Sequence, residues 1–174
     1  TLIDIISTYT RSSLIKLNAV FSSIKDLRNE IANAKERLLS TNRKTILFID
    51  EVHRFTAVQQ DALLPSIENG TITFIGATTE NPFFAVNKAL ISRARIFSLV
   101  PLTEKDLKKI IDKVINYYSS IQDSKTIKIT DDAINHLIKF SGGDARNLIN
   151  ALESGINTSK ESKLIIIDLS IAED

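Results

Sequence analysis

One short run of residues constrains the fold more than any other feature of the sequence. Four consecutive apolar residues, 46–49, are followed directly by Asp50 and Glu51. An unbroken apolar run that is rich in branched and aromatic side chains is typical of a parallel strand buried on both faces. Ligand sites in such sheets lie at the carboxyl ends of the strands. We therefore expect Asp50 and Glu51 at a ligand site, on opposite sides of the strand, one facing a metal and phosphate and the other an attacking water. The alternative is a core strand whose last acid only caps the next helix.

The residues on either side of this run alternate between strand and helix patterns. A helix is expected at the start of the chain, and strands are expected at 13–20, 71–78 and 96–100. Ser22 and Ser23 can cap one helix, and Thr56 can cap another that runs to about Ile67. Strands that alternate with helices indicate a parallel α/β sheet with helices on both faces, which we assign to residues 1–101.

Only helices are expected from Leu102 onward, and we assign residues 102–174 to an all-α lid domain. Thr103 caps the first helix, residues 119–128 form a loop, and Gly142 and Gly143 end the second helix. A third helix runs from Asp144 to near residue 155, and residues 165–167 begin a further short element. Lysines line one face of the first helix, and a solvated surface is the favoured interpretation over phosphate contacts.

Composition excludes few classes of protein. The formal net charge of +1 over 174 residues gives no overall attraction to nucleic acid, so DNA binding would need local patches. The chain has no cysteine, which excludes disulfides and thiolate metal sites. No apolar run reaches membrane-spanning length. The absence of methionine, even at position 1, leads us to expect a piece of a longer protein.

Four polar segments follow one another in the order of an ATPase template. Residues 50–51 match a Walker B motif, and 78–81, at the end of the next strand, match a sensor 1. Residues 92–95 match an arginine finger, and 143–146 match a sensor 2 at the start of a lid helix. Each segment alone is a weak signal, but their order and separations together favour a nucleotide hydrolase.

The same segments give a closer resemblance. The sequence is similar to the replication-associated recombination protein A family, the bacterial RarA or MgsA group, which is related to the eukaryotic Werner-helicase-interacting ATPase. The similar segments are FIDEVHRF (48–55), QQDALLP (59–65), ENGT (68–71), IGATTENP (75–82) and LISRAR (90–95). The resemblance implies a P-loop NTPase-like AAA+ fold of the clamp-loader clade that uses ATP and Mg²⁺. It also implies an oligomer, usually a tetramer, that acts on DNA ends and single-strand gaps at stalled replication forks.

The resemblance extends to location and to single residues. It implies a protein without a membrane partner, cytoplasmic and nucleoid-associated in bacteria or nuclear in eukaryotes, with single-strand-binding protein as a candidate partner. Asp50 would hold the magnesium, and Glu51 would orient and deprotonate the attacking water. Thr78 would sense the γ-phosphate, with Asn81 as a second candidate for that role.

Three arginines complete the site that the resemblance implies. Arg93 would reach the nucleotide of an adjacent subunit, and Arg95 is its rival for this finger role. Arg146, from the lid, would contact the phosphates and couple the lid to the nucleotide state.

The sequence departs from the family pattern in one respect. No Gly-x-x-x-x-Gly-Lys-Thr occurs, and Thr1 and Leu2 resemble the residues that directly follow that phosphate loop. We therefore expect a fragment without the Walker A segment that is inactive alone. Alternatives are a non-catalytic remnant or interaction module, and another clamp-loader or branch-migration subunit. The strand before the loop would lie between 72–78 and 96–100, so without it 96–100 should be the weakest strand.

Overall fold

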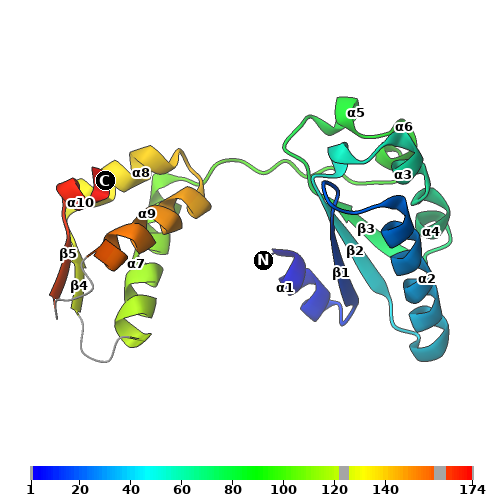
Figure 1. Ribbon diagram of the computed structural model, residues 1–174, viewed down its shortest axis with the longest axis horizontal. Coiled ribbons are helices and arrows are strands. Elements are labelled where there is room, and N and C mark those ends of the chain that lie inside the picture. The colour runs from blue at the N-terminus through cyan, green and yellow to red at the C-terminus, as the bar shows by residue number, and fades with distance from the viewer. Residues whose placement is uncertain (1, 122–125, 159–163, 174) are drawn as a thin grey trace. The chain divides into compact units, whose positions relative to one another are not determined.

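The computed structural model describes residues 2–121, 126–158 and 164–173, and the chain divides into two compact units, residues 1–97 and 98–174 (Figure 1). The boundary that we expect from the sequence, between 101 and 102, lies close to this division and remains a prediction about domains.

A three-stranded parallel sheet forms the centre of the first unit. Its strands are β1 (Ser13–Asn18), β2 (Thr45–Asp50) and β3 (Ile72–Gly76), in the order β1-β2-β3. Leu17 pairs with Ile49, and Ile49 pairs with Gly76, so the three strands end at one edge. The predicted parallel sheet is confirmed, and the strand that carries Asp50 is its middle one.

Seven helical elements accompany this sheet among the described residues. They are α1 (Leu2–Tyr9), α2 (Ile24–Thr41), the 3-10 helix η1 (Val52–Arg54), α3 (Ala57–Asp61), α4 (Leu64–Glu68), α5 (Pro82–Ala85) and α6 (Lys88–Ile91). Ser23 and Thr56 cap α2 and α3 as predicted. The single helix expected from Thr56 to Ile67 is two short helices, because Pro65 has no N–H and its ring clashes with a carbonyl of the preceding turn.

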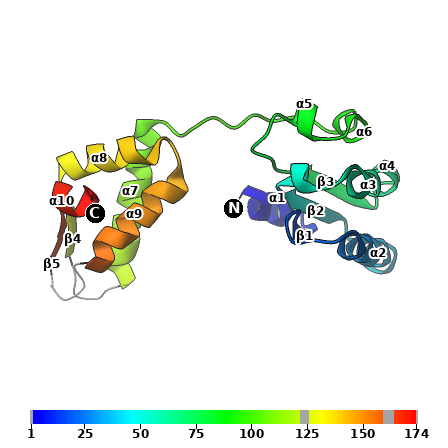
Figure 2. The same cartoon turned by 45° about the horizontal axis from the view of Figure 1, so that its top comes forward.

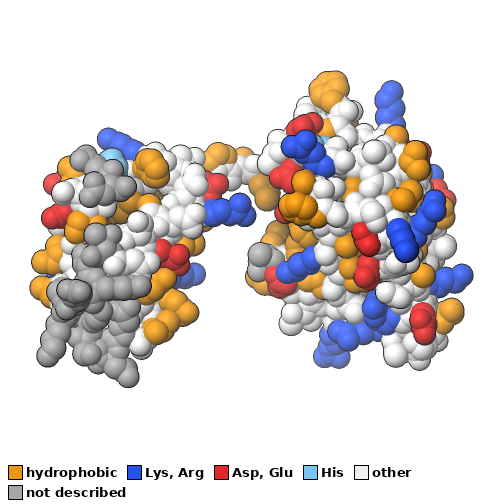
Figure 3. Space-filling model, viewed as in Figure 1, with side chains coloured by type: hydrophobic (Ala, Val, Ile, Leu, Met, Phe, Trp, Pro, Cys, Tyr) orange, Lys and Arg blue, Asp and Glu red, His pale blue; other side chains and the backbone are white. Residues whose placement is uncertain are grey.

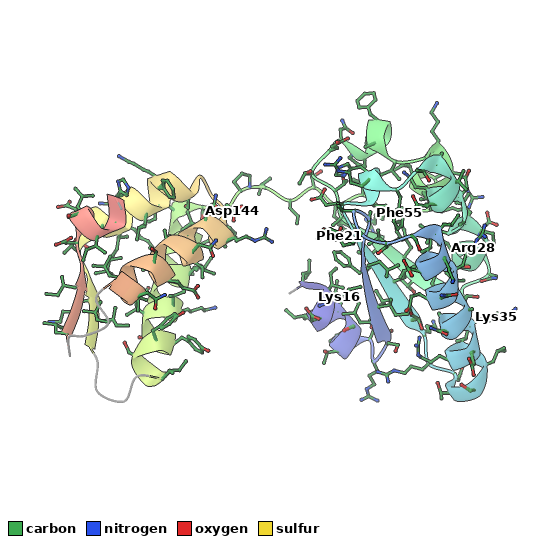
Figure 4. The ribbon with its side chains drawn as sticks, in the orientation of Figure 1. Lys16, Phe21, Arg28, Lys35, Phe55 and Asp144 are labelled. Atoms are coloured by element: carbon green, nitrogen blue, oxygen red, sulfur yellow. The ribbon has the colours of Figure 1, made fainter. Side chains whose placement is uncertain are left out.

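The two faces of the sheet are covered by different helices. Figures 1 and 2 show α1 on one face and α2, α3 and α4 on the other. Leu27 of α2 packs in one core cluster with Leu47 and Ile49 of β2, and all three are at most 1% exposed. On the opposite face Lys16 of β1 forms an ion pair with Asp4 of α1 at 2.6 Å (Figure 4). The main core therefore lies on the α2 side.

The strand predicted at 96–100 is wrong, because the structure has no strand there. Phe97, Leu99 and Val100 are 76%, 86% and 81% exposed, and Figure 3 shows hydrophobic side chains along the segment that joins the two units. A strand needs a hydrogen-bonded neighbour. Among the described residues β3 pairs only with β2, and the segment 96–100 is hydrogen-bonded to no strand. The sequence has the side chains of a strand but no partner for one.

The second unit is mainly helical, with a small sheet. Its elements are α7 (Glu104–Ile121), β4 (Thr126–Ile129), α8 (Asp131–Ser141), α9 (Ala145–Thr158), β5 (Leu164–Ile167) and α10 (Leu169–Glu173). β4 and β5 pair in parallel, which corrects the expectation of helices only. Of the loop expected at 119–128, residues 119–121 belong to α7 and 126–128 to β4, and 122–125 lie outside the described residues. Ile127, Ile165 and Ile167 point into the core, and such short alternating strands carry little signal in a sequence.

Candidate functional site

The carboxyl ends of β2 and β3 bring the acid pair and the sensor candidates together. The amide of Ala77 donates to the carbonyl of Ile49 at 2.9 Å, and the amide of Val52 donates back to the carbonyl of Ala77 at 2.9 Å. The pairing of the two strands thus continues past their last regular residues. As a result, the backbone next to Glu51 is hydrogen-bonded to the backbone next to Thr78.

Asp50 is available for a ligand. Its side chain is exposed at the end of β2. Its Oδ1 accepts a hydrogen bond from the neighbouring amide of Glu51 at 3.2 Å, and within the described part of the chain no other partner bonds to the carboxylate. An unpaired carboxylate at this edge is the hard oxygen donor that Mg²⁺ prefers.

Glu51 departs from the geometry that we expect from the sequence. Its backbone is left-handed, with φ 53° and ψ 44°, so Glu51 lies outside β2. The prediction that Asp50 and Glu51 alternate across a strand is therefore wrong, because alternation holds only while the backbone stays extended. A left-handed residue other than glycine or asparagine costs about 1–2 kcal/mol. Such strain clusters at functional sites, where surrounding structure maintains it.

His53 lies at the centre of the polar cluster, and the sequence prediction did not include it. Its Nδ1 is 2.9 Å from the Thr78 hydroxyl and 3.2 Å from Oε2 of Glu51. Its Nε2 is 3.5 Å from Oε1 of Glu80. The His53 side chain is only 9% exposed, whereas that of Glu51 is 33% exposed. The available signal was a histidine two residues after the acid pair, in the tight turn that follows the strand.

Thr78 and Asn81, the two sensor candidates, have different surroundings. The half-buried Thr78 hydroxyl contacts His53 and accepts a hydrogen bond from the amide of Glu80 at 3.1 Å. The side-chain Oδ1 of Asn81 accepts a hydrogen bond from the amide of Phe83 at 3.1 Å and caps α5. Because Asn81 already has this structural role, the geometry favours Thr78.

The finger candidate Arg93 lies just after α6 and is paired within its own chain. Its guanidinium contacts Oε1 of Glu68 at 2.6 and 2.8 Å, and it donates to the carbonyl of Ala89 at 2.9 Å. None of its partners among the described residues belongs to the acid cluster. The rival, Arg95, has its guanidinium 5.7 Å from the ring centre of Phe97. The finger role of either residue stays a prediction.

Arg146 belongs to the second unit. It is exposed in the first turn of α9, where its amide donates to Oδ1 of Asp144 at 2.6 Å. The predicted contact of Arg146 with the nucleotide of the first unit stays a prediction.

The first unit also has a depression away from this edge. It has a volume of about 540 Å³ and is lined by residues 10–12 and 41–44, at the amino ends of β1 and β2. Because ligands of parallel sheets bind at the carboxyl ends, we keep the acid pair as the candidate site.

The donor set at the acid pair fits a nucleotide-borne magnesium rather than a metal held by the protein alone. The described residues contain no group of three His, Asp or Glu side chains that could hold an ion. Mg²⁺ is usually bound through one or two carboxylates together with substrate phosphates and waters. Asp50 fits that pattern.

In the described part of the chain, no helix is long and apolar enough to cross a membrane.

Comparisons with known proteins agree with this geometry. The family model "ATPase family associated with various cellular activities (AAA)" matches residues 1–102. Replication-associated recombination protein A of Escherichia coli (strain K12) is 41% identical over 88% of this chain and 34% of its own length. ATPase WRNIP1 of Dictyostelium discoideum is 41% identical over 94% of this chain and 18% of its own length. The chain thus spans about a third or less of these relatives.

A solved structure supports the fold of both units. The RuvB Holliday junction branch migration motor of Thermotoga maritima has a TM-score of 0.73 and 25% identity, over 99% of this chain and 55% of that chain. With the AAA family model covering the whole first unit and curated relatives above 40% identity, the chain belongs to the AAA ATPases, in the group of replication-associated recombination protein A and its eukaryotic relative.

Proposed function

We propose that the chain is part of an ATP-hydrolysing AAA+ machine of the replication-associated recombination protein A type. The observation that carries the proposal is the edge formed by β2 and β3, where an exposed Asp50 carboxylate precedes a strained Glu51 that shares His53 Nδ1 with the Thr78 hydroxyl. This constellation supplies a metal ligand, a general base and a polar sensor at adjacent strand ends. The identity of 41% to the recombination protein, against 25% to the branch migration motor, favours the former lineage.

The chain's own residues have distinct tasks in this proposal. Asp50 would hold a nucleotide-bound Mg²⁺, which neutralises charge on the phosphates when it is present. Glu51 orients a water and accepts its proton, and general-base catalysis of this kind contributes about 10²- to 10⁴-fold in rate. Thr78 contacts the phosphate end. Arg93 acts on the nucleotide of a neighbouring subunit, and Arg146 acts from the lid.

We include the partners and the cell compartment in the proposal. The expected substrate is DNA with single-strand gaps or ends at stalled forks, and the expected assembly is a homo-oligomer, a tetramer in the intact protein. Single-strand-binding protein is a candidate partner, and the expected location is the cytoplasm, at the nucleoid, or the nucleus. The name of the bacterial relative supports a role in replication-associated recombination, and this support reaches the chain only through sequence similarity.

Glu51→Gln tests the proposal in a version of the chain that carries the family's phosphate-loop segment ahead of residue 1. The amide fills the same space but accepts no proton, so we expect ATP turnover to fall at least about 10²-fold while ATP binding stays unchanged. Glu36→Gln, at an exposed position of α2, is the matched control and should keep the parent's turnover. Turnover of the Glu51→Gln variant within a few-fold of the parent would remove Glu51 from the role of base.

A non-catalytic interaction module is the competing proposal. The sequence as given contains no phosphate-loop motif, so it lacks the amides and lysine that normally hold the β- and γ-phosphates. Measuring ATP and gapped-DNA binding by fluorescence anisotropy, in the 174-residue chain and in the extended version, separates the two. ATP binding that appears only in the extended version supports the ATPase, and DNA binding without ATP binding in both supports the module.

A further inference from the structure

His53 makes contacts that a mere core histidine does not need. Its Nδ1 lies within hydrogen-bonding distance of two oxygens at once, Oγ1 of Thr78 at 2.9 Å and Oε2 of Glu51 at 3.2 Å. These two oxygens come from the ends of two different strands. They are also the oxygens to which the proposed function gives the sensor role and the general-base role.

A single imidazole nitrogen cannot serve both oxygens in the same way. If Nδ1 carries a proton, it donates to the Glu51 carboxylate, since charge-assisted hydrogen bonds are the stronger ones. If Nδ1 is unprotonated, its lone pair accepts the Thr78 hydroxyl proton, and the same lone pair then faces and repels the Glu51 oxygen. The two tautomers of a neutral His53 therefore correspond to two arrangements: Glu51 held by the ring, or Glu51 held only by the Thr79 hydroxyl at 3.5 Å.

The Thr78 hydroxyl has one proton to donate, and its oxygen already accepts from the amide of Glu80 at 3.1 Å. When that proton goes to any acceptor other than His53, the Nδ1 lone pair loses its donor. The Nδ1–H tautomer, which holds Glu51, is then favoured. When the proton goes to His53, Oε2 of Glu51 loses the ring as a donor and keeps the longer hydrogen bond from the Thr79 hydroxyl, at 3.5 Å. The state of Thr78 thus sets the position of Glu51 through one ring.

We propose that His53 is a positioning residue that couples the Thr78 hydroxyl to the Glu51 carboxylate by a change of tautomer. The roles of Thr78 and Glu51 rest on the proposed function, but the coupling itself rests on the three contacts of the ring. His53 acts through the Glu51 carboxylate and the Thr78 hydroxyl, and it does not itself take the proton of the attacking water. It decides whether the carboxylate is held in place when the sensor hydroxyl is engaged elsewhere.

The surroundings keep the ring where this coupling requires it. Val52 and Phe55 flank His53 and are only 2% and 3% exposed, so the turn is anchored in the core. The amide of Arg54 donates to the carbonyl of Glu51 at 2.8 Å and closes the turn. On the far side of the ring, Nε2 lies 3.5 Å from Oε1 of the exposed Glu80. The ring is therefore fixed, while the protons on it remain free to move.

Nitrogen NMR of the imidazole tests the coupling without any catalysis. The chain has two histidines, so His136→Phe leaves His53 as the only imidazole, and the chemical shifts of its two nitrogens report its tautomer. Thr78→Val removes the hydroxyl at nearly constant shape, and we expect the Nδ1–H tautomer to rise about fivefold. Glu51→Gln should favour the other tautomer, since the amide can donate to Nδ1.

Thr73→Val is the matched control for these spectra, because Thr73 is an exposed threonine of β3, the strand that leads to Thr78. We expect this variant to leave the tautomer ratio unchanged. A ratio that stays the same in the Thr78→Val and Glu51→Gln variants, or that moves as much in the control, would overturn the coupling. The NMR spectra of each variant are recorded both in the 174-residue chain and in the version that carries the phosphate-loop segment. If a variant does not fold in one of these two proteins, the other still gives the tautomer ratio.

Turnover in the extended version gives the second readout. We expect His53→Phe to lower kcat for ATP hydrolysis about tenfold or more with ATP binding unchanged, because Glu51 is misplaced rather than lost. His53→Asn keeps a polar atom near the place of Nδ1 and should restore part of kcat, and His136→Phe should have no effect. A His53→Phe variant with the parent's kcat refutes the positioning role. An inactive parent with responsive tautomers refutes the proposed function alone.

Discussion

Two adjacent glycines at the end of α8 offer a matched test of how the start of α9 is built. Gly142 and Gly143 both have positive φ, 57° and 85°. A Cβ added at Gly142 would meet no atom within 4 Å, whereas a Cβ at Gly143 would lie 2.6 Å from Cβ of Pro101 and 3.2 Å from the carbonyl oxygen of Leu102. The Gly143 carbonyl also accepts a hydrogen bond from the Leu102 amide at 2.9 Å. The two alanine substitutions therefore share the cost of positive φ, and only the one at position 143 adds a steric clash with Pro101 and Leu102.

The expected free-energy costs follow from this difference. Placing alanine at positive φ costs about 1 kcal/mol, and Gly142→Ala should lose only that amount of unfolding free energy. Gly143→Ala adds overpacking, about 1–3 kcal/mol, and strains a hydrogen bond whose net value is about 1 kcal/mol. The sum is about 2–5 kcal/mol. In a domain of about 60–100 residues each kcal/mol lowers Tm by about 4–8 °C, so Gly143→Ala should lower it by at least about 8 °C.

Tyrosine fluorescence can follow this transition selectively. Tyr117 and Tyr118 lie on α7 in the second unit, the chain has no tryptophan, and a Tyr9→Phe background removes the remaining tyrosine. Thermal unfolding of the two glycine variants in that background gives the comparison directly. Equal shifts of Tm in Gly142→Ala and Gly143→Ala would refute the reasoning from close approach and leave only the backbone term.

Two further predictions concern the finger and the cap of α2. Mixing Arg93→Ala subunits with Glu51→Gln subunits of the extended version should restore part of the ATP turnover, because a mixed interface pairs an intact base with an intact finger. Absence of rescue at every ratio would place Arg93 outside catalysis in trans. The hydrogen bond from the Ser23 hydroxyl, together with that from the Ser23 amide, holds the pKa of the Asp26 carboxyl below its ordinary value. The cap therefore stabilises α2 above the unfolded aspartate pKa of about 3.9, and this contribution is lost as the pH falls through the lower folded pKa. Ser23→Ala should raise the pKa of Asp26 in an NMR titration, and an unchanged titration would contradict this cause.

The central strand could be predicted from the sequence because its signal is local. An apolar run buried on both faces has few other solutions, and β2 occupies residues 45–50 as expected. The caps at Ser23 and Thr56 were equally local, since each depends on a side chain three residues away. The placement of Asp50 followed from these alone.

The details of the site depend on contacts between strands, and local patterns do not contain them. The left-handed backbone of Glu51 is held where the amide of Val52 bonds to Ala77, 25 residues away in the chain but adjacent in the sheet. His53 contacts Thr78 for the same reason. The prediction of a strand at 96–100 was wrong for the opposite reason. The side chains there favour a strand, but a strand also requires a hydrogen-bonded neighbouring strand, which the local sequence does not reveal.

The position of β3 links these observations. β3 leads to Thr78 and is an edge strand among the described residues, so one hydrogen-bonded ladder, that to β2, holds it. The Val52–Ala77 bond extends that ladder and also holds the strained turn at Glu51. Displacement of β3 along β2 would therefore disturb the sensor candidate and the base candidate together. A side-chain link between Thr78 and Glu51 through His53 adds a route that does not require the strands to move, because only protons and a carboxylate change place. Movement of β3 would change the positions of Thr78 and Glu51 together, whereas the His53 ring would change only the hydrogen bonds of their side chains.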